Sequence, residues 1–179
     1  MQFQTWFNVQ ESSLSSLYQS AVAAFPSTTK RQHATDLVRI TELQWTPYLG
    51  MKTLFIRGLA QSEESGKEYM PIVVLKDVQY HPSKEQSNWV EIIANDGKQY
   101  TFEKLNHADN DVLVRCNCPD FSWRFNYYNH LDNSLYGRKR TKYEAISNRG
   151  PANPFELPGM CKHLMKLVKS LDHAGILEG

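Results

Sequence analysis

Apolar residues first recur at helical spacing, which predicts an amphipathic helix near the N-terminus. After Ser12 and Ser13, which can cap a helix, the apolar positions fall three and four residues apart and stop before Pro26. We expect this stripe to pack on a core, with a partner groove as the alternative. Residues 2–7 alternate and predict a strand or an arm. The stripe consists of Leu14, Leu17, Tyr18, Ala21, Val22 and Phe25.

From residue 36 to residue 116 the pattern changes to short apolar segments separated by turn residues, which is typical of antiparallel β structure. Asn95-Asp96-Gly97 predicts a hairpin, because Asn and Gly tolerate positive φ. A polar stretch that contains Gly66 predicts another turn. The expected strands are 37–43, 53–59, 69–78, 89–93, 100–102 and 112–116.

The last third of the chain predicts two more helical segments around an irregular connection. Pro119 can start a helix, and FSWRFNYYNHL follows it with five aromatic residues. A final helix after Pro158-Gly159 would bury Leu164, Val168 and Leu171 and expose its lysines. Between these segments, residues 132–159 predict a long loop rich in Gly and Pro, and such loops are usually functional or mobile.

The three cysteines lie in two short motifs with one histidine. Cys116 and Cys118 form Cys-x-Cys, and Cys161 and His163 form Cys-x-His. In an extended segment, side chains two residues apart point to the same side, so Cys116 and Cys118 can reach one ion. Cys161 and His163 lie at the start of the predicted final helix, and the N-terminus of a helix favours thiolates over thiols. Four such ligands suit a structural Zn²⁺ site with no open position, whereas an odd number of cysteines cannot all form disulfides. The alternative is three buried, unligated thiols.

This arrangement resembles the SWIM-type zinc finger over about residues 112–171. The resemblance implies that Cys116, Cys118, Cys161 and His163 are the metal ligands, with a spacer of 42 residues, 119–160, between the two pairs. Within that spacer, CPDFSWRF, the Asn126–Asn129 stretch and NPFELPGMCKHL resemble tailed-phage proteins. His130 or His173 could replace a ligand, but His163 already completes the set of four.

These patterns together predict an α+β fold with a helix and an antiparallel sheet or small barrel, followed by a zinc-stapled module that ends in a helix. We expect residues 1–111 to form the first domain. Residues 112–179 would form the SWIM-like module with its loop at 132–159. The aromatic residues after Cys118 should shield the metal. Base stacking is their alternative role.

The composition and net charge of the chain argue against several classes of function. Net charge is +1 over 179 residues, which argues against a strongly basic nucleic-acid binder, although residues 115–179 carry 10 basic and 6 acidic side chains. No apolar stretch approaches the length of a membrane span, and no signal peptide is recognisable. Unpaired thiols fit a reducing cytoplasm. No nucleotide loop or nucleophile motif is present, so we do not expect an enzyme.

The basic segment Arg138, Lys139, Arg140 and Lys142 is the remaining candidate binding site. It could contact an acidic protein surface or phosphates, with neighbours Arg115, Arg124 and Arg149, or it could be a solvated loop. We expect a non-catalytic zinc-binding structural or interaction protein, which binds other subunits of an assembly. The phage resemblance implies a virion or assembly component, found in the host cytoplasm and then in the virion. The alternative is a SWIM-type DNA- or RNA-binding protein.

Overall fold

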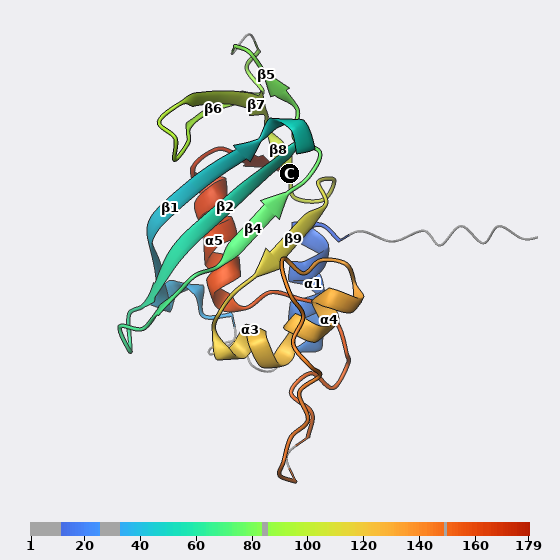
Figure 1. The fold of residues 1–179 in the computed structure, drawn as a ribbon. Coiled ribbons are helices and arrows are strands. Elements are labelled where there is room, and N and C mark those ends of the chain that lie inside the picture. The colour runs from blue at the N-terminus through green and yellow to red at the C-terminus, as the bar shows by residue number, and fades with distance from the viewer. Residues whose placement is uncertain (1–11, 26–32, 84–85, 149) are drawn as a thin grey trace, which may run out of the picture.

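An antiparallel sheet with helices on one face forms the centre of the molecule, which we describe from a computed structural model (Figure 1). The structure describes residues 12–25, 33–83, 86–148 and 150–179. The strand or arm predicted for residues 2–7 lies outside them. The predicted α+β class with antiparallel sheets is confirmed.

The main sheet has the strand order β1-β2-β4-β9, all antiparallel, and the short β3 also pairs with β2. It is an open sheet rather than a barrel. Alternate residues of β2, among them Leu54 and Ile56, are buried on the inner face, as the two-residue period of a strand requires. Its strands are β1 (Val38–Tyr48), β2 (Thr53–Ser62), β3 (Glu68–Tyr69), β4 (Ile72–Leu75) and β9 (Val112–Arg115).

Two smaller sheets extend the main one. The hairpin predicted around Asn95-Asp96-Gly97 is formed, but only Gly97 has a positive φ, of 76°. The parallel pair β8 and β10 joins the chain end to the centre, and the sequence pattern did not indicate it. These strands are β5 (Tyr80–His81), β6 (Trp89–Ile93), β7 (Gln99–Glu103), β8 (Leu105–Asn106) and β10 (Leu177–Glu178).

Helix α5 (Lys162–His173) lies behind the main sheet and packs mainly on β1 (Figure 1). Its apolar positions, including Leu164 and Leu171, are fully buried. The predicted N-terminal helix is α1 (Leu14–Ala24), capped by Ser13, whose hydroxyl accepts the Ser16 N–H at 3.2 Å. Half of its predicted stripe is buried, namely Leu14, Leu17 and Ala21, while the rest is partly buried or, at Tyr18, half exposed. One core cluster joins residues of α1, the main sheet and α5, and β9 belongs to the same sheet as β4.

Two short helices follow β9, α3 (Pro119–Arg124) and α4 (Asn126–Leu131), and the predicted loop 132–159 starts from them. The side-chain amide of Asn129 fixes the far end of this loop. It accepts the Gly159 N–H at 2.9 Å and donates to the Gly159 carbonyl at 3.0 Å. Asn129 is fully buried, so both hydrogen bonds are sheltered from water.

We predict that Gly159→Ala destabilises the protein by about 1–3 kcal/mol, the usual cost of overpacking a core. A Cβ at this position would lie 2.5 Å from Cε1 of the buried Phe125 and 3.0 Å from Cβ of Ala21. Urea denaturation followed by circular dichroism measures the change. Gly150→Ala is the control, because a Cβ there meets nothing within 4 Å. Equal midpoints for the two variants would contradict the prediction.

Candidate metal centre

The structure brings the four predicted ligand residues together at the lower end of the sheet. The ligand atoms of Cys116, Cys118, Cys161 and His163 all lie within 4.8 Å of one another. Nδ1 of His163 lies 3.9 Å from Sγ of Cys116 and 3.9 Å from Sγ of Cys161. All four residues are at most 3% exposed. This buried Cys3His group could hold one metal ion.

Local structure explains how the first pair converges. Cys116 directly follows β9, and Cys118 is the N-cap of α3, with the Phe121 N–H 3.3 Å from its sulfur. Pro119 occupies the first turn, where its missing N–H costs nothing. Between the two cysteines, Asn117 accepts the backbone N–H of Met70 at 2.8 Å, which ties the motif to the segment between β3 and β4. The Cys-x-Cys motif is therefore held at both ends.

The second pair belongs to the start of α5. Cys161 is the N-cap residue with extended backbone angles, and His163 is the second residue of the helix. The N-termini of α3 and α5 thus both meet the cluster. The free N–H groups of a helix start carry partial positive charge, so both ends favour thiolates over thiols. The Tyr69 ring covers the imidazole, with 4.7 Å between the two ring centroids.

Electrostatics explains how a cation would suit the cluster. Burial raises the pKa values of the Cys116 and Cys161 thiols, which have no access to water. Hydrogen bonds from these two thiols, more than any other cause, lower the pKa of Cys118. A bound dication would compensate two of the three thiolate charges.

Arg124 supplies a further positive charge beside the sulfurs. Its side chain is 11% exposed and forms an ion pair with Asp120, one turn earlier on α3. Its guanidinium also lies 4.6 Å from the centroid of the Phe25 ring. Desolvation lowers the Arg124 pKa to about 10, while the charges of Cys161 and Cys118 oppose this shift. Arg124 therefore remains a cation at neutral pH, next to a site with excess negative charge.

The aromatic segment after Cys118 divides into buried and exposed residues. Phe121, Phe125 and Tyr128 are buried, and the first two belong to the core that surrounds the cysteines, as the shielding role requires. Trp123 is 52% exposed and stacks on Tyr143 from the long loop, with 5.4 Å between the ring centroids. Base stacking, the alternative role, stays a prediction for the exposed Trp123.

The predicted basic site is exposed but is not one cluster. Lys142 forms a 3.0 Å ion pair with Glu156, and it lines two hollows beside Trp123, one of them together with Arg140. The side chains of Arg138 and Lys139 point to neither hollow and form no ion pair within the part of the chain described. Arg149 lies outside the described residues. His130 and His173 are exposed and do not belong to the Cys3His group.

Three buried asparagines organise the long loop, and the sequence analysis did not give them this role. Asn126 accepts the Arg140 N–H at 2.7 Å, and Asn153 donates to the carbonyl groups of Arg124 and Leu157. Together with Asn129 they replace backbone pairing for a segment without strands or helices. Asn126 and Asn129 lie in a segment rich in aromatic residues. Buried polar side chains in such a segment need hydrogen-bond partners, so their position could have indicated this role.

Comparisons with known proteins add no relative. No family model, no curated protein and no solved structure matches the chain. The SWIM and tailed-phage assignments therefore stay predictions that rest on sequence motifs. No helix among the described residues is long and apolar enough to cross a membrane.

We predict that the metal-loaded protein loses stability as pH falls from about 8.5 toward the mildly acidic range. An unfolded thiol has a pKa of about 8.5, whereas a metal-bound cysteine stays a thiolate. Below that pH the unfolded chain binds up to three more protons than the folded, loaded chain, and His163, which must also be neutral to bind metal, adds a fourth at the acidic end of the range. Stability then falls by about 4 kcal/mol per pH unit for the three thiols and by at most about 5.5 kcal/mol per pH unit with the histidine. Thermal unfolding at constant free metal measures this slope. A flat profile would contradict the ligand assignment.

Proposed function

We propose that the protein is a non-catalytic, zinc-stapled interaction module. The observation that carries this proposal is the complete burial of a Cys3His group in which the protein supplies four ligands. Four protein ligands fill a tetrahedral zinc ion and leave no position for water or substrate, which is the pattern of structural rather than catalytic zinc sites.

The donor set and its spacing favour zinc. Three thiolates and one imidazole are ligands that zinc prefers, and an oxygen-seeking cation such as Mg²⁺ or Ca²⁺ would find none of its usual ligands here. A tetrahedron with zinc–sulfur bonds of about 2.3 Å and a zinc–nitrogen bond of about 2.1 Å places nitrogen and sulfur about 3.6 Å apart. The nitrogen–sulfur distances of 3.9 Å in this group are close to that spacing.

The role of the metal would be to stabilise the fold rather than to catalyse a reaction. Cys116 and Cys161 lie 45 positions apart, and the described residues of the loop between them form no strand or helix after α4. Zinc binding in small structural sites contributes about 10–16 kcal/mol. Whole domains are stable by about 5–15 kcal/mol. The metal can therefore decide whether this half of the protein folds.

Purified protein should contain one zinc per chain, and Cys118→Ser should lose the zinc and unfold residues 116–171, while much of the strand region stays folded. The serine hydroxyl is a poor zinc ligand, so the binding free energy that holds α3 and α5 together disappears. Elemental analysis and thermal denaturation measure both effects. His130→Gln is the control, because it changes an exposed histidine outside the group. A metal-free wild type that is fully folded would overturn the zinc assignment.

The partner of such a module would be another protein subunit, and the tailed-phage motifs suggest a virion or assembly component. Mass spectrometry of purified phage particles tests that placement. The second candidate is nucleic-acid binding, which the exposed basic loop favours, since Arg138 and Lys139 have no ion-pair partner among the described residues. The carboxylate of Glu156 already engages Lys142, which weakens this candidate.

Replacing Arg138, Lys139, Arg140 and Lys142 together by alanine separates the two candidates. We expect weak wild-type binding to duplex DNA at physiological salt, because a net charge of +1 provides little long-range attraction. The variant should stay folded and zinc-loaded while it fails to enter assemblies. Tight wild-type binding would favour the nucleic-acid candidate instead. The variant should then lose affinity, and the salt dependence should flatten by about 0.9 per lost phosphate contact.

A further inference from the structure

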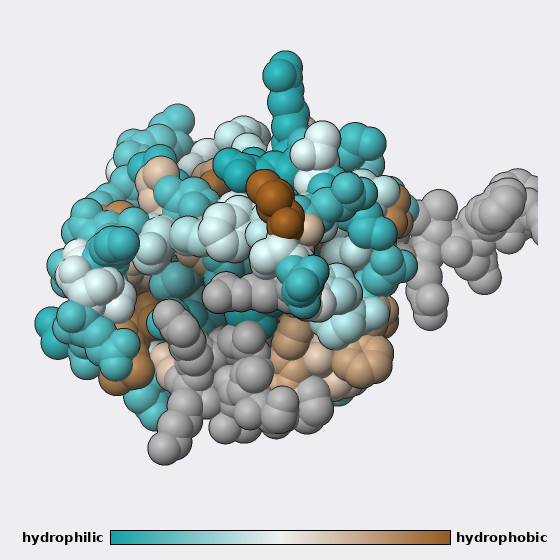
Figure 2. All heavy atoms as spheres, turned by 90° about the horizontal axis from the view of Figure 1, so that it is seen from below, coloured by the Kyte–Doolittle hydropathy of each residue, from teal (hydrophilic) through white to brown (hydrophobic). Residues whose placement is uncertain are grey.

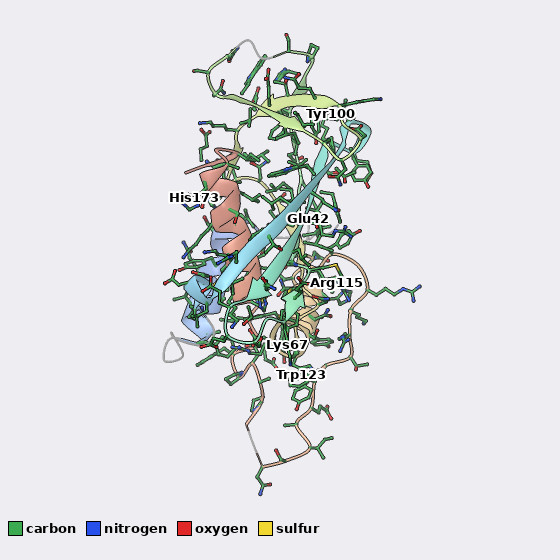
Figure 3. All side chains as sticks on the ribbon, turned by 90° about the vertical axis from the view of Figure 1, so that its left-hand side faces the viewer. Glu42, Lys67, Tyr100, Arg115, Trp123 and His173 are labelled. Atoms are coloured by element: carbon green, nitrogen blue, oxygen red, sulfur yellow. The ribbon has the colours of Figure 1, made fainter. Side chains whose placement is uncertain are left out.

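Trp123 lies where three hollows of the surface meet. The first hollow, of about 750 Å³, is formed with Lys67, Arg124 and Lys162 beside the metal centre. A second, of about 420 Å³, runs along the loop past Arg140 and Lys142. The third, of about 230 Å³, lies against the two prolines Pro151 and Pro154. Figure 3 shows Trp123 and Lys67 near one another at the lower end of the sheet.

The centre of this surface is aromatic and rigid. Trp123 and Tyr143 stack with an angle of 12° between their rings, and half of each side chain remains exposed. Tyr127 and Tyr128 contribute to the wall of the smallest hollow. Trp, Tyr and Arg are the residues most enriched among those that dominate protein–protein binding, and they act best at the centre of a concave surface. This combination points to a partner that inserts a side chain.

The charges around Trp123 favour a protein over a nucleic acid. Every hollow includes at least one carboxylate, namely Glu64 and Asp120 in the first, Glu144 in the second and Glu156 in the third. A nucleic acid places phosphates at regular intervals and would bring some of them close to these carboxylates, whereas a protein segment can place its charged side chains only where the surface is positive. A mixed polar rim around an aromatic centre is instead the ordinary composition of a protein interface. Figure 2 shows the lower end as largely hydrophilic with separate hydrophobic patches.

The unpaired charges indicate which side chains the partner carries. Arg124 and Lys142 already have carboxylate partners, Asp120 and Glu156. Within the described part of the chain, Lys67, Arg140 and Lys162 form no ion pair, and of the four carboxylates only Glu64 and Glu144 are unpaired. Arg138 and Lys139 extend the positive charge along the loop. The rim therefore has excess positive charge that acidic side chains can complement.

We propose that the Trp123 surface binds a segment of another protein that inserts an apolar or aromatic side chain beside Trp123 and flanks it with Asp or Glu. This inference rests on the proposed interaction function and specifies its partner. The smallest hollow is below the roughly 300 Å³ of small-molecule pockets and suits one large side chain. The acidic flanks face Lys67, Arg140 and Lys162.

The test selects peptides from a random 12-residue library on the full-length, zinc-loaded chain and measures their affinity by fluorescence polarisation. We expect the selected peptides to share an aromatic or large apolar residue with acidic neighbours. Trp123→Ala should weaken binding at least tenfold, because truncation of a central aromatic residue commonly costs more than 1.4 kcal/mol. The double variant Lys67→Glu, Arg140→Glu should also weaken it, by several-fold.

Tyr48→Ala is the matched control. Tyr48 is an aromatic residue with 47% exposure that lines a separate apolar hollow of about 480 Å³ on the outer face of the sheet. Its replacement should leave affinity unchanged. If Tyr48→Ala abolishes binding and Trp123→Ala does not, the inference is wrong. Failure to select any peptide, or selection of basic peptides, would also overturn it.

Two further measurements test other occupants of the surface. If the wild type forms a dimer in sedimentation experiments and Trp123→Ala abolishes it, the occupant of the surface is a second copy of the chain. If a thymidine oligonucleotide binds tightly at physiological salt and Trp123→Ala abolishes that binding, the occupant of the surface is single-stranded nucleic acid. Either result contradicts the inference. Zinc content and unfolding temperature of each variant are measured in parallel, so loss of the metal centre is distinguished from loss of the partner.

Discussion

The convergence of three thiols and one imidazole on a single point is the constraint on which this half of the structure depends. The end of β9, the start of α3 and the start of α5 all meet there. Burial raises the pKa values of two of the thiols, and hydrogen bonds from them lower the pKa of the third, so more than one thiolate is costly to bury here without a counter-charge. A bound cation would supply that counter-charge and link the three segments.

The charges around this centre interact over a short distance. Three thiolates around a dication would leave one negative charge, and the buried guanidinium of Arg124 lies close enough to Cys161 and Cys118 to interact with their charges. Asp120 pairs with that guanidinium and the Phe25 ring packs against it, so Arg124 offsets the negative charge only in part. Arg124 directly follows Trp123 on α3, so the cation beside the candidate metal centre and the exposed tryptophan belong to the same short helix.

The sequence predicted the parts of this structure that depend on local pattern. The two cysteine motifs, the helix after Pro158-Gly159 and most main-sheet strands follow from periodicity and spacing, and the ligand residues meet as that spacing suggested. The strand predicted for 69–78 is interrupted at Pro71, which cannot donate to a ladder, and only Ile72–Leu75 continues as β4. The pairing of β8 with β10 joins segments about 70 residues apart, and two-residue strands have no periodicity to detect.

The conformation of the long loop could not be predicted from the sequence. Gly and Pro content correctly indicated a segment without regular structure, but its shape depends on Asn126, Asn129 and Asn153, whose partners are backbone groups far along the chain. Only the folded arrangement reveals which backbone groups those are. The same holds for the stacking of Trp123 on Tyr143, since the aromatic content of the segment predicted shielding of the metal and did not indicate which residue stays exposed.

The short helix α3 connects the candidate metal centre to the surface around Trp123. A helix of six residues is far below the length of about 12–15 residues at which isolated helices become even marginally stable. Its position is therefore set by its contacts, and the contact at its first turn is Cys118, the N-cap and a ligand of the predicted metal. Trp123 lies one turn later on the same helix. A metal bound in the cluster would fix the first turn of α3 and with it the exposed aromatic face, so we expect metal binding and the availability of this surface to change together.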